Sequence, residues 1–482
     1  MKKLLICLII VFLLALPIGC GPQAGDSNDG GNGEQQGQEQ AQVPQNVIVM
    51  IADGMGTGQL EIARLFEHGK EGELFMETLP HLALARTYSA DFKVTDSGAA
   101  GTALATGNKT NNGMIGVGPD GEELVSILDV FQEQGKTVGV VSTNTVTDAT
   151  PAAYVSKVEH RSGQDEIARQ IFEGRYPIAL GGGENFFLPE NQDGEDLLAA
   201  FEEEGYEIVK SKDELANVET NADTKVLGLF HPSFMNYVAD REVLDSEEPS
   251  LLEMSQKAIE IASQNEDGFF LMLEGARVDH ASHAADFGGI WREMIDFDVA
   301  VEYVINWAEE HGDTLVVVKS DHETMGVAAT EVMDIDALKS IEVSPEYMAQ
   351  QMEIDPSTNN YTTESVRQVF EEYANIRLSD EEIAEFQDNV WDGDDPEGRL
   401  HLEYLVGWEI GSIIAHHYNA GVIHRDIREK SKSTGGHTAN TVPVFAYGVG
   451  AENFDGMLNN IEIPKMIVEI AGYEFNLPPE DN

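Results

Sequence analysis

Several carboxylates and histidines in this sequence directly follow short apolar runs. Asp53 follows the run from Val47 to Ala52, and Glu274 follows the run from Phe269 to Leu273. Asp321 and His322 come just after a third run that ends at Lys319. Carboxylate and imidazole groups together are the ligands that zinc prefers when cysteine is absent. The pattern therefore predicts a metal site, although a lone Asp-Gly turn such as the one at Asp53 is common without metal.

A second group of ligand-type residues lies in the segment from Glu274 to His283. Asp279 and His283 are four residues apart, so on a helix their side chains share one face. The alternative is a surface helix with incidental acids, which the position directly after a buried run disfavours. His437 lies in the sequence Thr-Gly-Gly-His-Thr, and a lone histidine in such a place more often has a structural role than a role as a metal ligand. It becomes a candidate ligand because the other candidates need partners.

Ser97 begins a run of small residues that continues to Gly107. At the start of a helix, backbone amides favour an anion, and small side chains allow it to approach closely. Ser97 is therefore either a nucleophile or an ordinary helix N-cap. No Gly-x-Ser-x-Gly motif is present, so a serine hydrolase triad is not indicated. Asp148 and Thr150 follow another apolar run, and Arg161 could grip a phosphate with two parallel hydrogen bonds.

The elements that must position these residues alternate between strands and helices. Apolar runs such as Thr137 to Ser142 and Thr314 to Lys319 are separated by helical stretches such as Leu251 to Asn265 and Gly289 to Glu310. This alternation predicts an α/β fold, a three-layer α/β/α sandwich with a central, mostly parallel sheet. Ligands of such sheets gather at the carboxyl ends of the strands, where the candidates lie. The predicted domain spans residues 46–475, and the acidic segment 335–400 is expected to be an inserted helical cap.

The N-terminal segment has the features of an export signal. Two lysines precede an apolar run from Leu4 to Leu16, and residues 1–20 end in a motif similar to a bacterial lipoprotein box. Cys20 would then be lipidated and anchor an exported protein to the cell membrane; the alternative is plain secretion. Residues 21–45 are rich in Gly, Gln, Asn and Asp, which predicts a disordered linker.

The chain is strongly acidic, with 86 acidic against 29 basic residues and a net charge of -57. Nucleic acid is therefore an unfavourable partner, because its phosphates must be neutralised by Lys and Arg. The excess of acidic residues either forms an ordinary solvated surface or is an adaptation to high salt. We expect a halotolerant protein. Both cysteines, Cys7 and Cys20, lie in the leader, so the domain has no thiolate metal site.

Together these segments resemble the alkaline phosphatase family. The resemblance runs from Asn46 to about Gly450 and rests on four motifs: Asp-Ser-Gly-Ala-Ala-Gly-Thr-Ala at Asp96, Glu-Gly-Ala with its following Asp-His and His at Glu274, Asp-His-Glu-Thr at Asp321, and Gly-His-Thr at Gly436. It implies hydrolysis of small phosphate monoesters through a phosphoserine intermediate, with two Zn2+ and one Mg2+ as cofactors. A homodimer is left open.

The resemblance also implies roles for individual residues. Ser97 would be the nucleophile and Arg161 the phosphate clamp, with His280 beside the substrate. The implied ligands are Asp279, His283 and His437 for the first zinc; Asp53, Asp321 and His322, with Ser97, for the second; and Asp53, Thr150 and Glu274, with Asp148 through water, for magnesium. Asp148 and His280 are the types found in different branches of the family, so metal preference stays open.

Three other functions compete with this interpretation. A phosphodiesterase or cofactor-independent mutase shares the metal ligands, but does not share Arg161 or the Asp148-Ala149-Thr150 segment. A sulfatase is disfavoured because Ser97 lacks the Cys/Ser-x-Pro-x-Arg context. A lipoprotein that binds phosphate or metal without catalysis would not need the complete set of catalytic residues.

Overall fold

The computed structural model describes residues 43–391 and 400–475. These residues form a ten-stranded sheet with the order β14-β2-β13-β8-β1-β7-β3-β4-β6-β5. In that order, the strands are Gly456–Asn459, His81–Arg86, Val442–Gly448, Thr314–Lys319, Asn46–Ala52, Phe269–Gly275, Thr137–Thr145, Ile178–Gly182, Val226–Leu229 and Glu207–Val209. Within the described residues, β13 runs antiparallel to β8 and β2, and the other neighbouring strands of this sheet run parallel.

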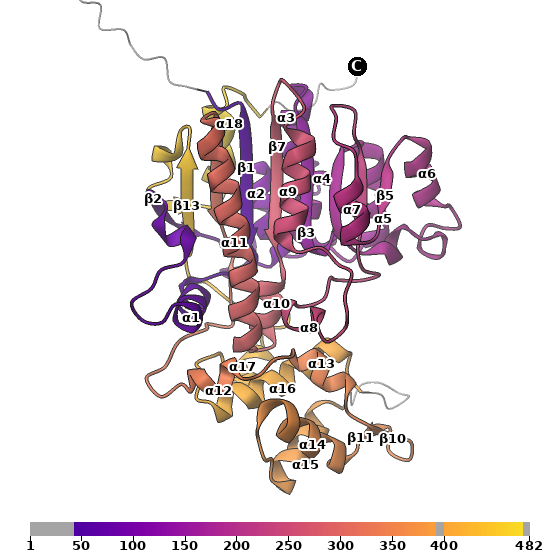
Figure 1. Cartoon of the computed structure of the whole chain (residues 1–482), viewed down its shortest axis with the longest axis vertical. Helices are drawn as coiled ribbons and strands as arrows, with labels where there is room; N and C mark the ends of the chain where they lie inside the picture. Colours follow the sequence, from indigo (N-terminus) through magenta and orange to yellow (C-terminus); the bar gives the residue numbers. More distant parts are fainter. Residues whose placement is uncertain (1–42, 392–399, 476–482) are drawn as a thin grey trace, which may run out of the picture. The chain divides into compact units, whose positions relative to one another are not determined.

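Both faces of the sheet are covered, which explains why its central strands are continuous apolar runs. In β1, Ile48 and Met50 belong to the hydrophobic core on one face, whereas Val47 and Val49 belong to the core on the other. The first core includes residues of α1 (Thr57–Glu67), α7 (Lys212–Asn217), α9 (Leu251–Ala262) and α11 (Phe287–His311). The second includes residues of α2 (Ser97–Thr106), α3 (Ile127–Glu133), α4 (Ala149–Val155), α5 (Gln164–Gly174), α6 (Leu197–Glu203) and α18 (Glu462–Ile470). Figure 1 shows α9 and α11 in front of the sheet. The predicted α/β sandwich with a mostly parallel sheet is confirmed.

A mainly helical segment follows the strand end that carries Asp321 and His322. It comprises α12 (Ile335–Lys339), α13 (Pro345–Gln350), β10 (Ile354–Asp355), β11 (Asn360–Tyr361), α14 (Thr363–Ala374), α15 (Asp380–Asn389), α16 (Glu403–His417) and α17 (Arg425–Arg428). We call these elements the cap; its helices lie below the sheet in Figure 1. Helices continue beyond residue 400, the expected end of the insertion. The expected helix start at Ser379 is confirmed by a capping box with Glu382.

The register of the sheet brings the candidate residues to one edge. Ala52 of β1 pairs with Gly275 of β7, and Ile51 pairs with Lys319 of β8. Because these three strands are parallel neighbours, the residues at their carboxyl ends meet. Asp53, Glu274 and the Asp321-His322 pair therefore come together, although more than 200 residues separate the first from the others.

The predicted leader, Cys20 and most of the predicted linker lie outside the described residues, as does part of the predicted insertion, residues 392–399. Within residues 43–391 and 400–475, no helix has the length and apolar content that a bilayer span requires.

Candidate active site

Asp53 lies in a tight turn that contacts the helix carrying Asp279. The next residue, Gly54, has φ of +76°, and a Cβ there would lie 2.8 Å from the Cα of Asp279. Its backbone N–H donates to Asp321 Oδ1 over 3.2 Å. Only glycine combines this backbone conformation with so close a contact. The turn thus ties the ends of β1 and β8 to α10 (Arg277–His283).

His322 lies between two of the predicted ligands. Its Nε2 is 3.4 Å from Asp53 Oδ1 and 3.1 Å from Asp321 Oδ2, and all three residues are buried. These side chains form a group whose ligand atoms lie within 4.8 Å of one another. They are the residues expected for the second zinc, and their spacing fits a single ion.

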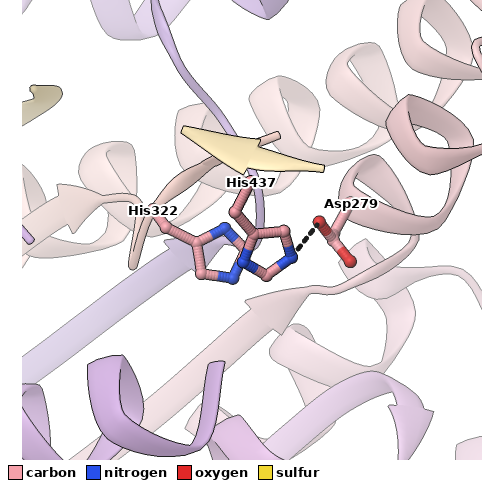
Figure 2. A group of neighbouring side chains, drawn as sticks. All are labelled: Asp279, His322 and His437. Atoms are coloured by element: carbon pink, nitrogen blue, oxygen red, sulfur yellow. Dashed lines mark ion pairs between the residues drawn. The ribbon is translucent and has the colours of Figure 1, made fainter. Parts of the chain in front are cut away.

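A second group contains Asp279, His322 and His437 (Figure 2). His437 lies on β12 (His437–Thr438), which pairs antiparallel with β9 (Glu323–Thr324), and its ring stacks on that of His322 at 3.6 Å. His283 Nε2 lies 3.3 Å from Asp279 Oδ2 and 3.1 Å from His437 Nε2. The three residues expected for the first zinc are therefore in mutual contact, and His322 is close to both groups.

Ser97 is the first residue of α2, and Asp96 is the N-cap of that helix. Asp96 Oδ1 accepts the N–H of Ala99, so the capping role left open for Ser97 is filled by its neighbour. Ser97 is buried, with its Oγ 3.1 Å from His322 Nε2. The hydroxyl therefore faces the histidine shared by the two groups of candidate ligands.

Arg161 is held by two carboxylates at the same site. It donates to Asp96 Oδ2 over 3.2 Å, and another guanidinium nitrogen lies 3.6 Å from Asp148 Oδ2. Burial raises the pKa of Asp148, with Arg161 opposing this effect. Burial acts to raise the pKa of Asp96, but Arg161 and the N–H groups of Ala99 and Gly113 outweigh burial, so that the pKa of Asp96 is lowered. Both carboxylates orient the guanidinium, which lines the same cavity as Ser97.

The residues expected for magnesium are all buried or nearly so. Glu274 Oε2 accepts from Ser142 over 2.5 Å. Burial raises the pKa of Glu274 well above its usual value, while hydrogen bonds from Ser142 and Thr150 oppose that rise. Thr150 lies in the first turn of α4, and Asp148 is the residue before that helix.

The donor set fits bound cations. Asp53 Oδ1, Asp321 Oδ2 and Glu274 Oε1 are buried without a well-formed hydrogen bond from a described residue, although His322 Nε2 lies within 3.4 Å of the first two. Burial, followed by repulsion from Asp321, raises the pKa of Asp53 well above its usual value. Burial lowers the pKa of His322 to about 4 and that of His437 to about 3, which leaves the neutral imidazoles that coordinate metals. Unpaired buried carboxylates are costly, and divalent cations would offset that cost.

His280, expected beside the substrate, lines the cavity over Ser97. The structure also places there two residues that the sequence did not single out, Arg277 and Phe234, and both contact His280. Thr324 donates to Asp279 Oδ1 over 2.5 Å, and Thr95 O lies 3.0 Å from His437 Nδ1. The Asp-Ser start of α2 is an N-cap signal that could have identified Asp96.

A buried hydroxyl at a helix start, facing carboxylates and neutral imidazoles at the carboxyl ends of parallel strands, is typical of a hydrolase of the α/β class, and the site includes candidate metal ligands. The family model for alkaline phosphatase matches residues 44–473. Alkaline phosphatase 4 of Bacillus subtilis is 33% identical over 449 residues, 90% of each chain. The chain belongs to the alkaline phosphatase family and is a phosphatase.

Solved structures agree with this assignment. The alkaline phosphatase of Thermus thermophilus is 28% identical, with a TM-score of 0.77 over 94% of this chain and 97% of that one. The alkaline phosphatase of the Antarctic bacterium TAB5 is 26% identical, with a TM-score of 0.63 over 90% of this chain and 99% of that one.

Proposed function

We propose that this phosphatase hydrolyses phosphate monoesters to an alcohol and inorganic phosphate, through a phosphoserine intermediate on Ser97, with two zinc ions and one magnesium ion. The observation that carries the proposal is the position of Ser97 Oγ, 3.1 Å from the His322 imidazole that is close to both candidate ligand groups. Bound divalent cations would lower the pKa of a hydroxyl and neutralise charge on the phosphoryl and leaving oxygens.

The residues of the chain divide the reaction between them. Arg161, oriented by Asp96 and Asp148, would hold two non-bridging oxygens of the substrate. Ser97 Oγ would lose its proton to solvent and attack phosphorus, forming the O–P bond as the bond to the alcohol oxygen breaks on the opposite side; the departing oxygen would take a proton from solvent and leave as the alcohol. Water would then enter from the vacated side and cleave the phosphoserine, which releases inorganic phosphate and restores the Ser97 hydroxyl. The N-terminal amides of α2 favour the negative charge at this position.

The proposed metal identities rest on the donor set. Asp279, His283 and His437 offer one carboxylate and two imidazoles, a set that suits zinc. Glu274, Thr150 and Asp148 offer only oxygen, which suits magnesium. A mutant of the TAB5 enzyme is described with magnesium bound in its M3 site.

The test compares p-nitrophenyl phosphate with bis(p-nitrophenyl) phosphate, using wild type, Ser97→Ala and the exposed control Ser263→Ala. We expect faster turnover of the monoester, loss of that activity in Ser97→Ala, and wild-type activity in the control. Elemental analysis should find zinc and magnesium near two to one in active protein. Faster diester turnover, or full activity in Ser97→Ala, would contradict the proposal.

We further propose that the chain is exported and anchored to the membrane through a lipid on Cys20. The support is the sequence of the leader. Labelling with a radioactive fatty acid in a bacterial host should mark the wild type but not Cys20→Ser; equal labelling of both would exclude a lipid on this residue.

A further inference from the structure

The cavity above Ser97 extends from the candidate metal ligands to the cap. Its volume is about 550 Å³, and its lining includes Ser97 and Arg161 at the reacting end. Organic ligands occupy pockets of ~300–1,000 Å³. The cavity therefore has room for a leaving group as well as for the phosphoryl group.

Away from Ser97, the lining is rich in aromatic side chains: Phe234, Tyr404 and Trp408, with Leu405 beside them. Tyr404 and Trp408 lie four residues apart on α16, so they share one face of that helix. Their rings are in edge-to-face contact at 5.7 Å. Phe234 comes from the segment between β6 and α8 (Val238–Arg241), and its ring contacts His280 edge to face at 5.2 Å. All three rings are only partly buried, which leaves ring surface available to a ligand. We call these three residues the aromatic wall.

The buried cations of this lining already have partners. Arg277 lies 3.6 Å from Glu346 and 3.5 Å from the ring centre of Tyr237. Arg428 lies 3.7 Å from Glu409. Lys432 is exposed, where a single charge contributes little. The wall therefore favours an uncharged aromatic group over a second anion.

We propose that the aromatic wall is a leaving-group subsite that favours phosphate monoesters of alcohols carrying an aromatic ring. The inference rests on the proposed monoester hydrolysis at Ser97. The substrate ring would pack against Tyr404 and Phe234 while its phosphoryl group lies at Arg161. Packing of this kind prefers offset or edge-to-face geometry, as the Tyr404–Trp408 pair of the wall shows.

The test uses 2-phenylethyl phosphate and n-butyl phosphate. Both are esters of primary alcohols, so their leaving groups have similar basicity and their difference reports on the ring. We expect the wild type to favour the phenylethyl ester by about threefold to tenfold in kcat/KM, the range that one aromatic pair provides. In Tyr404→Ala the ratio should fall toward one. Tyr404→Phe should keep it, because the variant retains the ring that packs against the substrate.

A matched control in the cap is Tyr373→Ala. Tyr373 lies on α14, packs against Tyr347 and does not line the cavity, so its removal should leave the ratio unchanged. Phe234→Ala tests the wall from a separate element if Tyr404→Ala does not fold. A wild-type ratio of one, or an unchanged ratio in both alanine variants, would overturn the subsite while monoester hydrolysis stands. Failure of the metal-loaded wild type to cleave p-nitrophenyl phosphate would instead overturn the proposed function itself.

Discussion

The indole of Trp408 stacks on the imidazole of His283, with ring centres 4.7 Å apart and ring planes 11° apart. The two residues come from different parts of the fold, Trp408 from α16 of the cap and His283 from the end of α10. His283 Nδ1 lies 3.1 Å from the carbonyl oxygen of Gly435, which leaves Nε2 directed at Asp279 and His437. The cap thus helps to orient the ring of a proposed zinc ligand.

Replacing Trp408 by alanine should weaken metal retention. Partners that orient a ligating histidine typically contribute 10–100-fold to metal affinity, and stacking is a weaker restraint than a hydrogen bond. We expect about tenfold faster zinc loss to a chromogenic chelator, and an intermediate rate for Trp408→Phe. Trp291→Ala, which removes an indole that packs on Phe66, is the control. Equal rates of zinc release from wild type and Trp408→Ala would show that the stack does not hold His283.

Arg161 should bias the enzyme toward monoesters. A guanidinium can hold two phosphoryl oxygens at once, which an ammonium cannot do. We expect Arg161→Lys to lower kcat/KM for p-nitrophenyl phosphate by about 10-fold to 100-fold, the value of a charged hydrogen bond. Turnover of the diester, which offers fewer free oxygens, should fall less. Arg169→Lys, in an exposed pair with Glu195, should match the wild type. An equal decrease in kcat/KM for both esters in Arg161→Lys would show that Arg161 does not favour monoesters over diesters.

The stability of the fold should depend on pH through Glu293, a buried residue of α11. Burial raises its pKa to about 7, while Arg241 and the N–H of Val238 oppose that rise. A carboxyl whose pKa is higher in the folded state keeps its proton there while the unfolded chain has lost it. The contribution of Glu293 to the free energy of unfolding therefore falls as pH rises from about 4.5 to about 7, by a few kcal/mol at most.

Glu293→Gln should remove this component, because an amide oxygen can still accept the Val238 N–H and does not ionise. Relative to wild type, the variant should gain stability as pH rises from about 4.5 to about 7 and show a constant difference above that range. Urea unfolding at pH 5, 6, 7 and 8 measures the effect. The exposed control Glu310→Gln should show a much smaller change. A wild-type advantage that grows with pH would reverse the assigned sign.

Salt should stabilise the protein, because a net charge of -57 repels itself within the folded state. Screening shortens the reach of that repulsion from about 10 Å at 0.1 M to about 3 Å at 1 M. We expect Tm to rise with NaCl over this range. Measuring Tm against the concentration of an uncharged osmolyte separates the screening of charge from the stabilisation that any solute excluded from the protein surface provides. A flat Tm from low salt to the molar range would contradict the prediction.

The sequence predicted the sheet well, because its central strands are buried on both faces and thus continuous apolar runs. The run Thr314 to Lys319 matches β8, and Gly289 to Glu310 lies inside α11. The candidate residues at the strand ends came from the same rule, since parallel strands deliver their carboxyl ends to one edge. Whether Ser97 caps its helix was undecided, because Asp96 and Ser97 are both good N-cap residues.

The aromatic wall could not be predicted, because its members are brought together only by tertiary contacts. Tyr404 and Trp408 have helical spacing, which is typical of ordinary packing as well. Phe234 is about 170 residues away from them in the sequence. The pairing of Arg161 with Asp96 and Asp148 is likewise set by the fold, since no local pattern joins those three positions.

The pairing of β9 with β12 has a consequence for how the family can vary. Thr324 and His437 are partners in this short ladder, and the cap occupies the chain between them. Ala328 and Gly421 form a further bridge just beyond it. The insertion therefore leaves and re-enters the core at one place, so its length and sequence can change in evolution without moving Asp321, His322 or His437. Asp321, His322 and His437 belong to the core, whereas the cap contributes Trp408, which stacks on His283, and Tyr404 of the proposed leaving-group subsite.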